Sequence, residues 1–402
     1  MTPLQRQLGR RRLLAGAGAA LLIGAVDGCS GGLAVKRRTP AAATLQPAPL
    51  QLAPLRAGTD RITQITVCTR PFRAQGPRIE AERIGQKIVV HNYGHGGSGW
   101  SLSWGSSSIA VEKAMAAGGA TDIAVIGCGA LGLTSSLLLQ RAGARVTIYA
   151  KELPPNVRSS LATGVWTPDS RVCLEDNATP QFKQLWANMA RRSFQTYQTL
   201  LGLPGNPVEF IDSYYVSDDP TSPRRGSLQN DTRPKFAELQ RELIADLIPR
   251  SEDFAPGTHS LGEHYLRRNT LMMFNIAAYA RLLMGDFLAN GGKIEIAAFH
   301  TPADLAKLRE KVLINATGYG ARALFGDESI TPVRGQLARM IPQPDVNYGL
   351  VYKGVAFVPR RDGMVFQVIG DDDYYGFNDA TTEPDRAEAE TAVNTIAALY
   401  QG

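Results

Sequence analysis

The sequence predicts a mixed α/β fold, in which a nucleotide-binding layer adjoins a second domain built on a mainly antiparallel sheet. Two short apolar runs flank a glycine-rich turn and a helix-like segment within residues 122–150. Another apolar run follows at 311–316, and short apolar segments alternate with turns after residue 330. Hydrophobic residues make up 44% of the 402-residue chain and charged residues 20%, which argues against a disordered or fibrous protein.

The elements expected in the nucleotide-binding layer are four parallel strands and two helices. Each strand is a short run of mainly Val, Ile and Ala, as is typical of strands that are buried on both faces. We expect strands near 87–91, 122–127, 145–150 and 311–316, and helices at 106–117 and 130–142. For the second domain we expect helices at 180–202 and 270–290, and strands at 207–216, 334–341, 349–359 and 363–369.

The positive charge of the chain is concentrated near its start. The formal net charge is +6, but residues 1–58 carry eight Lys and Arg against one acidic residue, Asp27. The rest of the chain is close to neutral, so a nucleic-acid-binding surface is not indicated. Four scattered cysteines and five histidines give no disulfide framework and no metal-binding pattern.

The first 58 residues have the composition of an export signal followed by a linker. Three arginines at 10–12 precede an apolar stretch at 13–26, which is shorter than the roughly 20 residues that span a bilayer. Residues 1–29 therefore resemble a bacterial twin-arginine signal peptide, with a Sec signal as the alternative. Cys29 ends a lipobox-like sequence. Either it is lipidated after cleavage of the signal, or the protein is simply released after cleavage, so we expect a membrane-anchored lipoprotein or a periplasmic protein. Residues 30–58 are rich in Pro and Ala and are expected to form a linker.

The glycine-rich turn has the spacing of a dinucleotide-binding fingerprint. The sequence GCGALG at 127–132 lies between an expected strand and an expected helix. Gly127 permits the tight turn, Gly129 lets the backbone approach a pyrophosphate, and Gly132 lets the helix pack on the strand, while the amides of Ala130 and Leu131 begin the helix. Glu152, after the second strand, is either the ribose-binding acid or a solvated surface charge. The fingerprint alone fits FAD and NAD equally.

Five other segments together resemble the D-amino-acid oxidase family of FAD enzymes. Residues 160–168 (SLATGVWTP) resemble its flavin loop, 312–318 (VLINATG) its second FAD segment, and 332–336 (PVRGQ) its arginine-glycine-glutamine strand. Residues 91–105 (HNYGHGGSGWSLSWG) closely resemble its C-terminal flavin signature, and 68–73 (CTRPFR) its substrate-arginine motif. The resemblance implies a Rossmann-like FAD-binding domain with FAD-binding parts at about 87–170 and 291–335. The parts of the substrate domain would be about 59–86, 171–290 and 336–402, within one unit from 59 to 402.

The order of these motifs differs from the order in the family. There the glycine fingerprint opens the chain and the arginine and histidine-glycine motifs close it, whereas here Arg70 and residues 91–105 precede the fingerprint. A circular permutation explains this order. Residues 109–117 would be the family's last helix, and the new ends would lie between a helix at 387–400 and Ile62.

The resemblance also implies which residues form the site. Arg70 would hold the substrate carboxylate through a two-pronged hydrogen bond, and the backbone carbonyl of Gly97 would accept a hydrogen bond from the substrate amine. Ala356 replaces a tyrosine that the family uses for the carboxylate, Tyr352 is the expected substitute, and Thr167 replaces a glutamine. The further FAD-binding residues implied are Ser159, Thr163, Gly164, Val165, Trp166, Phe299, Thr317, Gly96, Gly97, Gly99, Trp100 and Ser101.

The function expected is FAD-dependent oxidative deamination of a D-amino acid or a related small amine-carboxylate. The products would be a 2-oxo acid, ammonia and, with dioxygen as acceptor, hydrogen peroxide. One alternative is an exported dehydrogenase that passes electrons to a membrane quinone. A second, of another class, is a flavin-binding module without turnover, which the missing tyrosine would favour. An NAD dehydrogenase leaves the second FAD segment and the glycine-rich signature unexplained.

Overall fold

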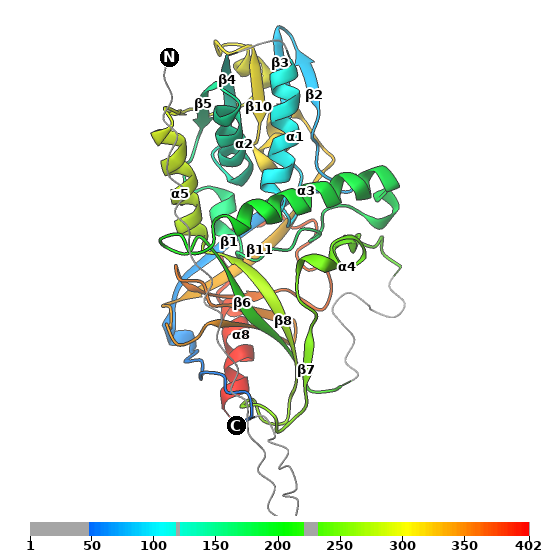
Figure 1. Ribbon diagram of the computed structural model, residues 1–402, viewed down its shortest axis with the longest axis vertical. Helices are drawn as coiled ribbons and strands as arrows, with labels where there is room; N and C mark the ends of the chain where they lie inside the picture. The colour runs from blue at the N-terminus through cyan, green and yellow to red at the C-terminus, as the bar shows by residue number, and fades with distance from the viewer. Residues whose placement is uncertain (1–47, 118–120, 221–231, 402) are drawn as a thin grey trace, which may run out of the picture. The chain divides into compact units, whose positions relative to one another are not determined.

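The computed structural model describes residues 48–117, 121–220 and 232–401. Residues 48–402 form one compact unit that contains two sheets (Figure 1). The predicted signal peptide, Cys29 and residues 30–47 of the predicted linker lie outside the described residues, as do residues 221–231. Among the described residues, no helix is both long enough and apolar enough to cross a bilayer.

The first sheet has six strands in the order β2-β3-β10-β4-β5-β9 and is parallel except for the pair β2–β3. Its strands are β2 (Ala81–Ile84), β3 (Lys87–His91), β10 (Val312–Asn315), β4 (Asp122–Ile126), β5 (Arg145–Ala150) and β9 (Lys293–Ile296). The four central strands are β3, β10, β4 and β5, and their apolar side chains are buried on both faces, as a parallel sheet requires.

Helices cover both faces of this sheet. On one face α1 (Ser103–Ala116), α2 (Ala130–Arg141) and α5 (Ile276–Ala289) share a core with β3, β4, β5 and β10, and α3 (Pro180–Gln198) crosses α1 (Figure 1). On the other face Leu305 of α6 (Pro302–Leu305) and Phe325 of α7 (Ala321–Phe325) pack against a smaller cluster.

The second sheet has eight strands in the order β1-β11-β14-β13-β12-β6-β8-β7 and is antiparallel except for the pair β12–β6. Its strands are β1 (Ile62–Arg73), β11 (Ile330–Met340), β14 (Met364–Val368), β13 (Val355–Val358), β12 (Tyr348–Tyr352), β6 (Val208–Ser217), β8 (Tyr265–Phe274) and β7 (Glu252–Phe254). One face packs against α8 (Arg386–Ala397), and the other faces the site. A short helix, α4 (Leu239–Leu243), precedes β7.

The chain places its early and late segments side by side. β1 pairs with β11 over nearly its whole length, with Arg70 opposite Val333. Near the start of β1, the backbone carbonyl of Thr59 accepts a hydrogen bond from Arg386 at the beginning of α8, 2.9 Å away. The segment before β1 therefore lies against the last helix of the chain.

Three sequence predictions about elements need correction. Residues 270–290 are not one helix, because β8 continues to Phe274 and α5 begins only at Ile276. Residues 349–359 form two strands, since Lys353 and Gly354 both have positive φ and close the hairpin. The expected domain boundaries also differ from the boundaries of the sheets. Residues 59–86 were assigned to the substrate domain, but β2 within them joins the six-stranded sheet. Residues 291–335 were assigned to the FAD-binding domain, but β11 begins at Ile330 and belongs to the eight-stranded sheet.

Candidate active site

A cavity of about 750 Å³ lies where the two sheets meet. One side consists of the turns that follow β4, β5 and β10, at the carboxyl ends of parallel strands, where α/β folds bind their ligands. The other side consists of strands of the eight-stranded sheet, including β1, β12, β13 and β14. Loop 94–100 and the loop around residues 157–171 complete the wall.

The fingerprint turn lies at one end of the cavity. Gly127, Gly129, Ala130 and Leu131 line it, and Gly129 immediately precedes α2. The amide of Ala130 donates to Ser159 Oγ at 3.1 Å, so the flavin-loop residue Ser159 is tied to the helix start. Exposed amides at a helix N-terminus attract anions. This end therefore suits a pyrophosphate.

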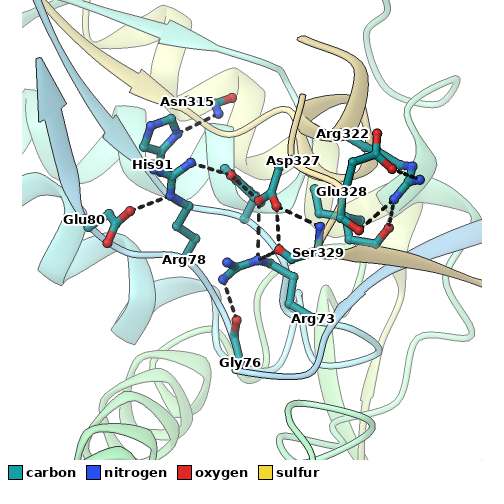
Figure 2. Close-up of polar contacts among 12 residues, drawn as sticks. Arg73, Gly76, Arg78, Glu80, His91, Asn315, Arg322, Asp327, Glu328 and Ser329 are labelled. Carbon is teal, nitrogen blue, oxygen red and sulfur yellow. Dashed lines mark hydrogen bonds and ion pairs between the residues drawn. The ribbon is translucent and has the colours of Figure 1, made fainter. Parts of the chain in front are cut away.

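The turn after β10 is held by a chain of buried hydrogen bonds. Asn315 Oδ1 accepts hydrogen bonds from the amide and the hydroxyl of Thr317. Its Nδ2 is therefore free to donate to His91 Nδ1 at 3.1 Å (Figure 2). His91 Nε2 is then the protonated nitrogen, and it donates to Glu82 at 2.9 Å. Burial lowers the pKa of His91, which keeps the ring neutral. Through Asn315, the histidine fixes Thr317 at the cavity wall.

Beside this chain of hydrogen bonds, a polar network joins β1 and the segment after β3 to the loop before β11 (Figure 2). Asp327 Oδ2 accepts a hydrogen bond from the Tyr93 hydroxyl at 2.7 Å and lies 3.4 Å from Arg73 Nε. Arg73 also donates to Ser329 Oγ at 2.9 Å and to the carbonyl of Gly76 at 2.9 Å. Arg73 is therefore a structural residue, and Arg70 is the arginine of this motif that reaches the cavity.

Loop 94–100 presents His95 as a neutral ring. His95 is 1% exposed, and desolvation by burial lowers its pKa to about 3. Ser106 Oγ donates to Asn92 Oδ1, so it accepts from His95 Nε2, 2.7 Å away. Nδ1 is therefore the unprotonated nitrogen. The ring stabilises the loop from within the protein, and the loop backbone around Gly96 and Gly97 is left to face the cavity.

Arg70 lies at the substrate end of the cavity. Its Nη1 donates to the carbonyl of Arg334 at 3.2 Å, which leaves other N–H groups for a ligand. The guanidinium covers Gly335, where a Cβ atom would be only 2.5 Å from Nη1, so a larger residue at this position would displace the guanidinium. Arg334 itself points away and pairs with Glu388 at 2.6 Å. A planar guanidinium held in this way suits a carboxylate.

The structure brings most of the predicted site residues to this one cavity. Arg70 and Gly97 line it, and so does Thr167. The predicted FAD-binding residues that line it are Gly127, Gly129, Ala130, Leu131, Glu152, Ser159, Thr163, Gly164, Val165, Phe299, Thr317, Gly96, Gly97, Gly99 and Trp100. Glu152 lies just after the end of β5, and its exposed carboxylate is 3.9 Å from Lys151 Nζ.

Four predicted residues do not line the cavity. Tyr352 packs in the core beneath α8 and donates to Asp218 at 2.9 Å, so it does not substitute for the missing phenol. Trp166 is buried against Phe194 because its neighbours on either side face the cavity. Ser101 Oγ instead accepts a hydrogen bond from the amide of Thr167. Gly132 packs so tightly on the fingerprint turn that an added Cβ atom would lie 2.0 Å from the carbonyl oxygen of Gly127.

Sequence reasoning missed several polar residues of the cavity, among them Gln367, Arg171 and Tyr375. Arg171 is 6% exposed and pairs with Asp373 at 3.5 Å. Glu388 is near Tyr375, and burial is the main cause that raises the pKa of this phenol to about 12. Gln367 had a usable signal, since it is a lone polar residue among apolar ones in a strand-like segment.

The residues present fit FAD. Three features line one continuous cavity: an anion-binding helix start, a second turn fixed through Asn315, and the glycine-rich loop 94–100. The helix start would hold the pyrophosphate, and loop 94–100 would lie against the flavin ring. Among residues 48–117, 121–220 and 232–401, no three His, Cys, Asp or Glu side chains gather as metal ligands.

The chain is similar to one enzyme family and to several known proteins. Residues 122–402 match the model of the family described as FAD dependent oxidoreductase. A D-amino-acid oxidase of Streptomyces coelicolor is 27% identical over 285 residues, covering 69% of this chain and 77% of the relative. A D-amino-acid oxidase of Rubrobacter xylanophilus is 24% identical over 283 residues, covering 68% and 76%. The solved structure of iminodiacetate oxidase from Chelativorans sp. BNC1 aligns at 14% identity and a TM-score of 0.46 over 69% of this chain and 80% of that one. Because the family match covers well over half of the chain and includes the fingerprint, strands of both sheets and the last helix, this chain belongs to the FAD dependent oxidoreductase family.

Proposed function

We propose that this protein oxidises the Cα–N bond of a small amino acid, with D-amino acids as the first candidates. The observation that carries the proposal is the place of Arg70, whose guanidinium lines the same cavity as the glycine loop and the fingerprint turn. The names of the two relatives, both D-amino-acid oxidases, support the choice of substrate class.

The chain's own residues would act mainly by positioning. Arg70 binds the carboxylate and fixes its orientation, and the carbonyl of Gly97 accepts a hydrogen bond from the amine. Bound FAD would supply the oxidant for transfer of the α-hydrogen as a hydride, with dioxygen as the final electron acceptor and hydrogen peroxide as its product. The neutral amine's lone pair assists this transfer, so no protein base is required, and orientation supplies most of the rate. Water then hydrolyses the imino acid to a 2-oxo acid and ammonia.

The test is an anaerobic absorbance titration of the FAD-loaded protein with pools of D-amino acids, then glycine and sarcosine. Bleaching by one pool supports the proposal. A wild-type protein that retains FAD and is bleached by no amino acid would refute it and favour a flavin-binding module without turnover. Arg70→Lys keeps the charge but loses the two-pronged geometry, so we expect KM to rise about tenfold or more with unchanged FAD content.

The electron acceptor is a second point of the proposal. We propose dioxygen, with a membrane quinone as the alternative that a lipidated Cys29 would favour. Re-admitting air to the bleached protein separates the two, because an oxidase regains its yellow colour within seconds and produces hydrogen peroxide. A protein that stays bleached in air but is reoxidised by a soluble quinone would overturn the oxidase assignment.

We also propose that the chain is a circular permutation of the family's order. The family match begins at Asp122, directly at β4, while the preceding β1 and β3 belong to the same two sheets as the matched strands. The contact between Thr59 and Arg386 supports a junction there. A chain rebuilt to run from 122 to 402 and then, through a short linker, from 59 to 117 should fold and bind FAD. An insoluble product without FAD would count against the permutation.

The cellular location is a further part of the proposal. We propose export of the folded, FAD-loaded protein through the twin-arginine signal of residues 1–29, since a buried cofactor must be inserted before export. Replacing Arg10, Arg11 and Arg12 by Lys in a bacterial host should retain the protein in the cytoplasm. Export that continues in a host without the twin-arginine translocase would contradict this and favour the Sec alternative.

A further inference from the structure

The side of the cavity formed by the eight-stranded sheet has a mainly apolar surface with one buried amide in it. We call this surface the floor, and it is formed by Leu271 of β8, Val351 of β12, and Ala356 and Val358 of β13, together with Gln367 of β14. Ala356 and Gln367 are directly paired across β13 and β14. The small side chain of Ala356 therefore leaves open space beside the longer side chain of Gln367.

The orientation of the Gln367 amide is set by the flavin loop. Its Oε1 accepts a hydrogen bond from the Thr163 hydroxyl at 2.5 Å. This leaves the Nε2 group on the side of the cavity, where it has no hydrogen-bond partner among the residues that the structure describes. The Gln367 side chain is only 4% exposed, and the residue lines the cavity, so its Nε2 group can be reached only from there. These N–H groups therefore suit a ligand in the cavity that accepts hydrogen bonds.

Arg70 is within reach of the same ligand. Its guanidinium lies over Gly335 of β11, and Gly335 is two residues, or about 7 Å, along this strand from Leu337. β11 is the neighbour of β14, with Ala338 paired to Phe366, the residue before Gln367. Arg70 and Gln367 therefore approach the cavity from neighbouring positions on one sheet, and both offer only donors.

We propose that Gln367 is a substrate-binding residue that shares the carboxylate with Arg70, above an apolar floor centred on Ala356. This inference rests on the proposed function and names the kind of substrate that suits it. Because Gln367 turns its N–H groups toward the cavity and its oxygen toward Thr163, it binds the carboxylate and not the ammonium group. The side chain of the substrate lies toward Leu271, Val351 and Ala356, so amino acids with an apolar side chain are preferred over acidic or basic ones.

The test measures carboxylate binding without turnover. Propionate, which cannot be oxidised at an amine, is titrated into the FAD-loaded protein and its Kd is taken from the perturbation of the flavin absorbance. For Gln367→Leu, which keeps the size and removes the donors, we expect a Kd about ten- to a hundredfold higher, as for loss of one hydrogen bond to a charged group. Gln367→Glu adds a negative charge and should weaken binding further. FAD content and melting temperature verify that each variant is folded.

The matched control is Gln343→Leu. Gln343 is also 4% exposed, but it does not line the cavity, and it accepts a hydrogen bond from the backbone of Arg56 at 2.9 Å. This variant should bind propionate like the wild type. Gln367→Leu with an unchanged propionate Kd would overturn the inference even if amino acids bleach the flavin. Conversely, a wild type that no amino acid bleaches refutes the proposed function, while the difference in propionate binding still tests the carboxylate subsite.

Discussion

The glycine loop allows a sharp test, because two of its glycines have opposite surroundings. Gly96 has φ +55°, and a Cβ there would lie 1.9 Å from the carbonyl oxygen of Arg171. Gly99, three residues on, has no described atom within 4 Å of an added Cβ and no left-handed φ. Gly96→Ala should therefore strain the fold, and Gly99→Ala is its control within the same loop.

The size of the effect follows from two costs. An alanine in the left-handed region costs about 1–2 kcal/mol, and forcing the Arg171 backbone away adds about 1–3 kcal/mol. The sum is about 2–5 kcal/mol. At about 2.1 cal/mol/K per residue, a unit of about 350 residues unfolds with an entropy of about 0.7 kcal/mol/K. The expected fall in Tm for Gly96→Ala is therefore about 3–7 °C.

The assay is thermal unfolding of the FAD-free proteins followed by circular dichroism, so that cofactor affinity does not enter the comparison. Wild type and Gly99→Ala should melt together, with Gly96→Ala several degrees lower. If Gly96→Ala melts within one degree of Gly99→Ala, the loop is not packed against residues 170–171 as described. The assignment of loop 94–100 as a rigid wall of the cavity would then be wrong.

Three further predictions rest on buried groups. The pKa of His95 falls from 6.5 to about 3 in the folded chain, so the unfolded chain binds the extra proton between these values and stability is lost as pH falls below 6.5. At pH 5 the free energy of unfolding should be about 2 kcal/mol lower than at pH 7. Urea unfolding of His95→Asn should show a smaller decrease between these pH values than the wild type. Asn315→Asp cannot donate to neutral His91, so it should release Thr317 and raise the Kd for FAD, measured by flavin fluorescence; unchanged affinity would exclude this positioning role. Burial raises the pKa of Cys128 to about 12, so iodoacetamide at pH 8 should leave this thiol unmodified in the folded protein and label it in urea, as peptide mass spectrometry can verify.

The parts of the fold that the sequence predicted well are those fixed by local backbone requirements. Gly127 and Gly129 stand between two apolar runs, and only a strand–turn–helix unit satisfies that pattern. The central parallel strands were equally clear, because burial on both faces demands uninterrupted apolar residues. By contrast, residues 270–274 and 276–289 are both apolar, and composition alone does not mark the change from β8 to α5 at Asn275.

The errors at the site have a different physical origin. Tyr352 and Trp166 occupy elements that do reach the cavity, but extended chain alternates its side chains between two faces, and in both cases the neighbour faces inward. A shift of one residue in the alignment of a motif therefore exchanges a ligand-binding residue for a core residue. Gln367 was overlooked for another reason: a lone amide in an apolar strand marks an unusual position, but the sequence does not show that it is paired with Ala356 at the cavity.

The arrangement of the two sheets explains how the chemistry tolerates the unusual motif order. Arg70 is carried by β1, which reaches the site through its ladder with β11 and not through its position along the chain. Likewise, His91 at the end of β3 contacts Asn315 at the end of β10 because these strands are neighbours. Both contacts depend on strand pairing alone. A break elsewhere in the chain would leave them intact if the opened connection is a surface loop and the former ends can be joined by a short turn.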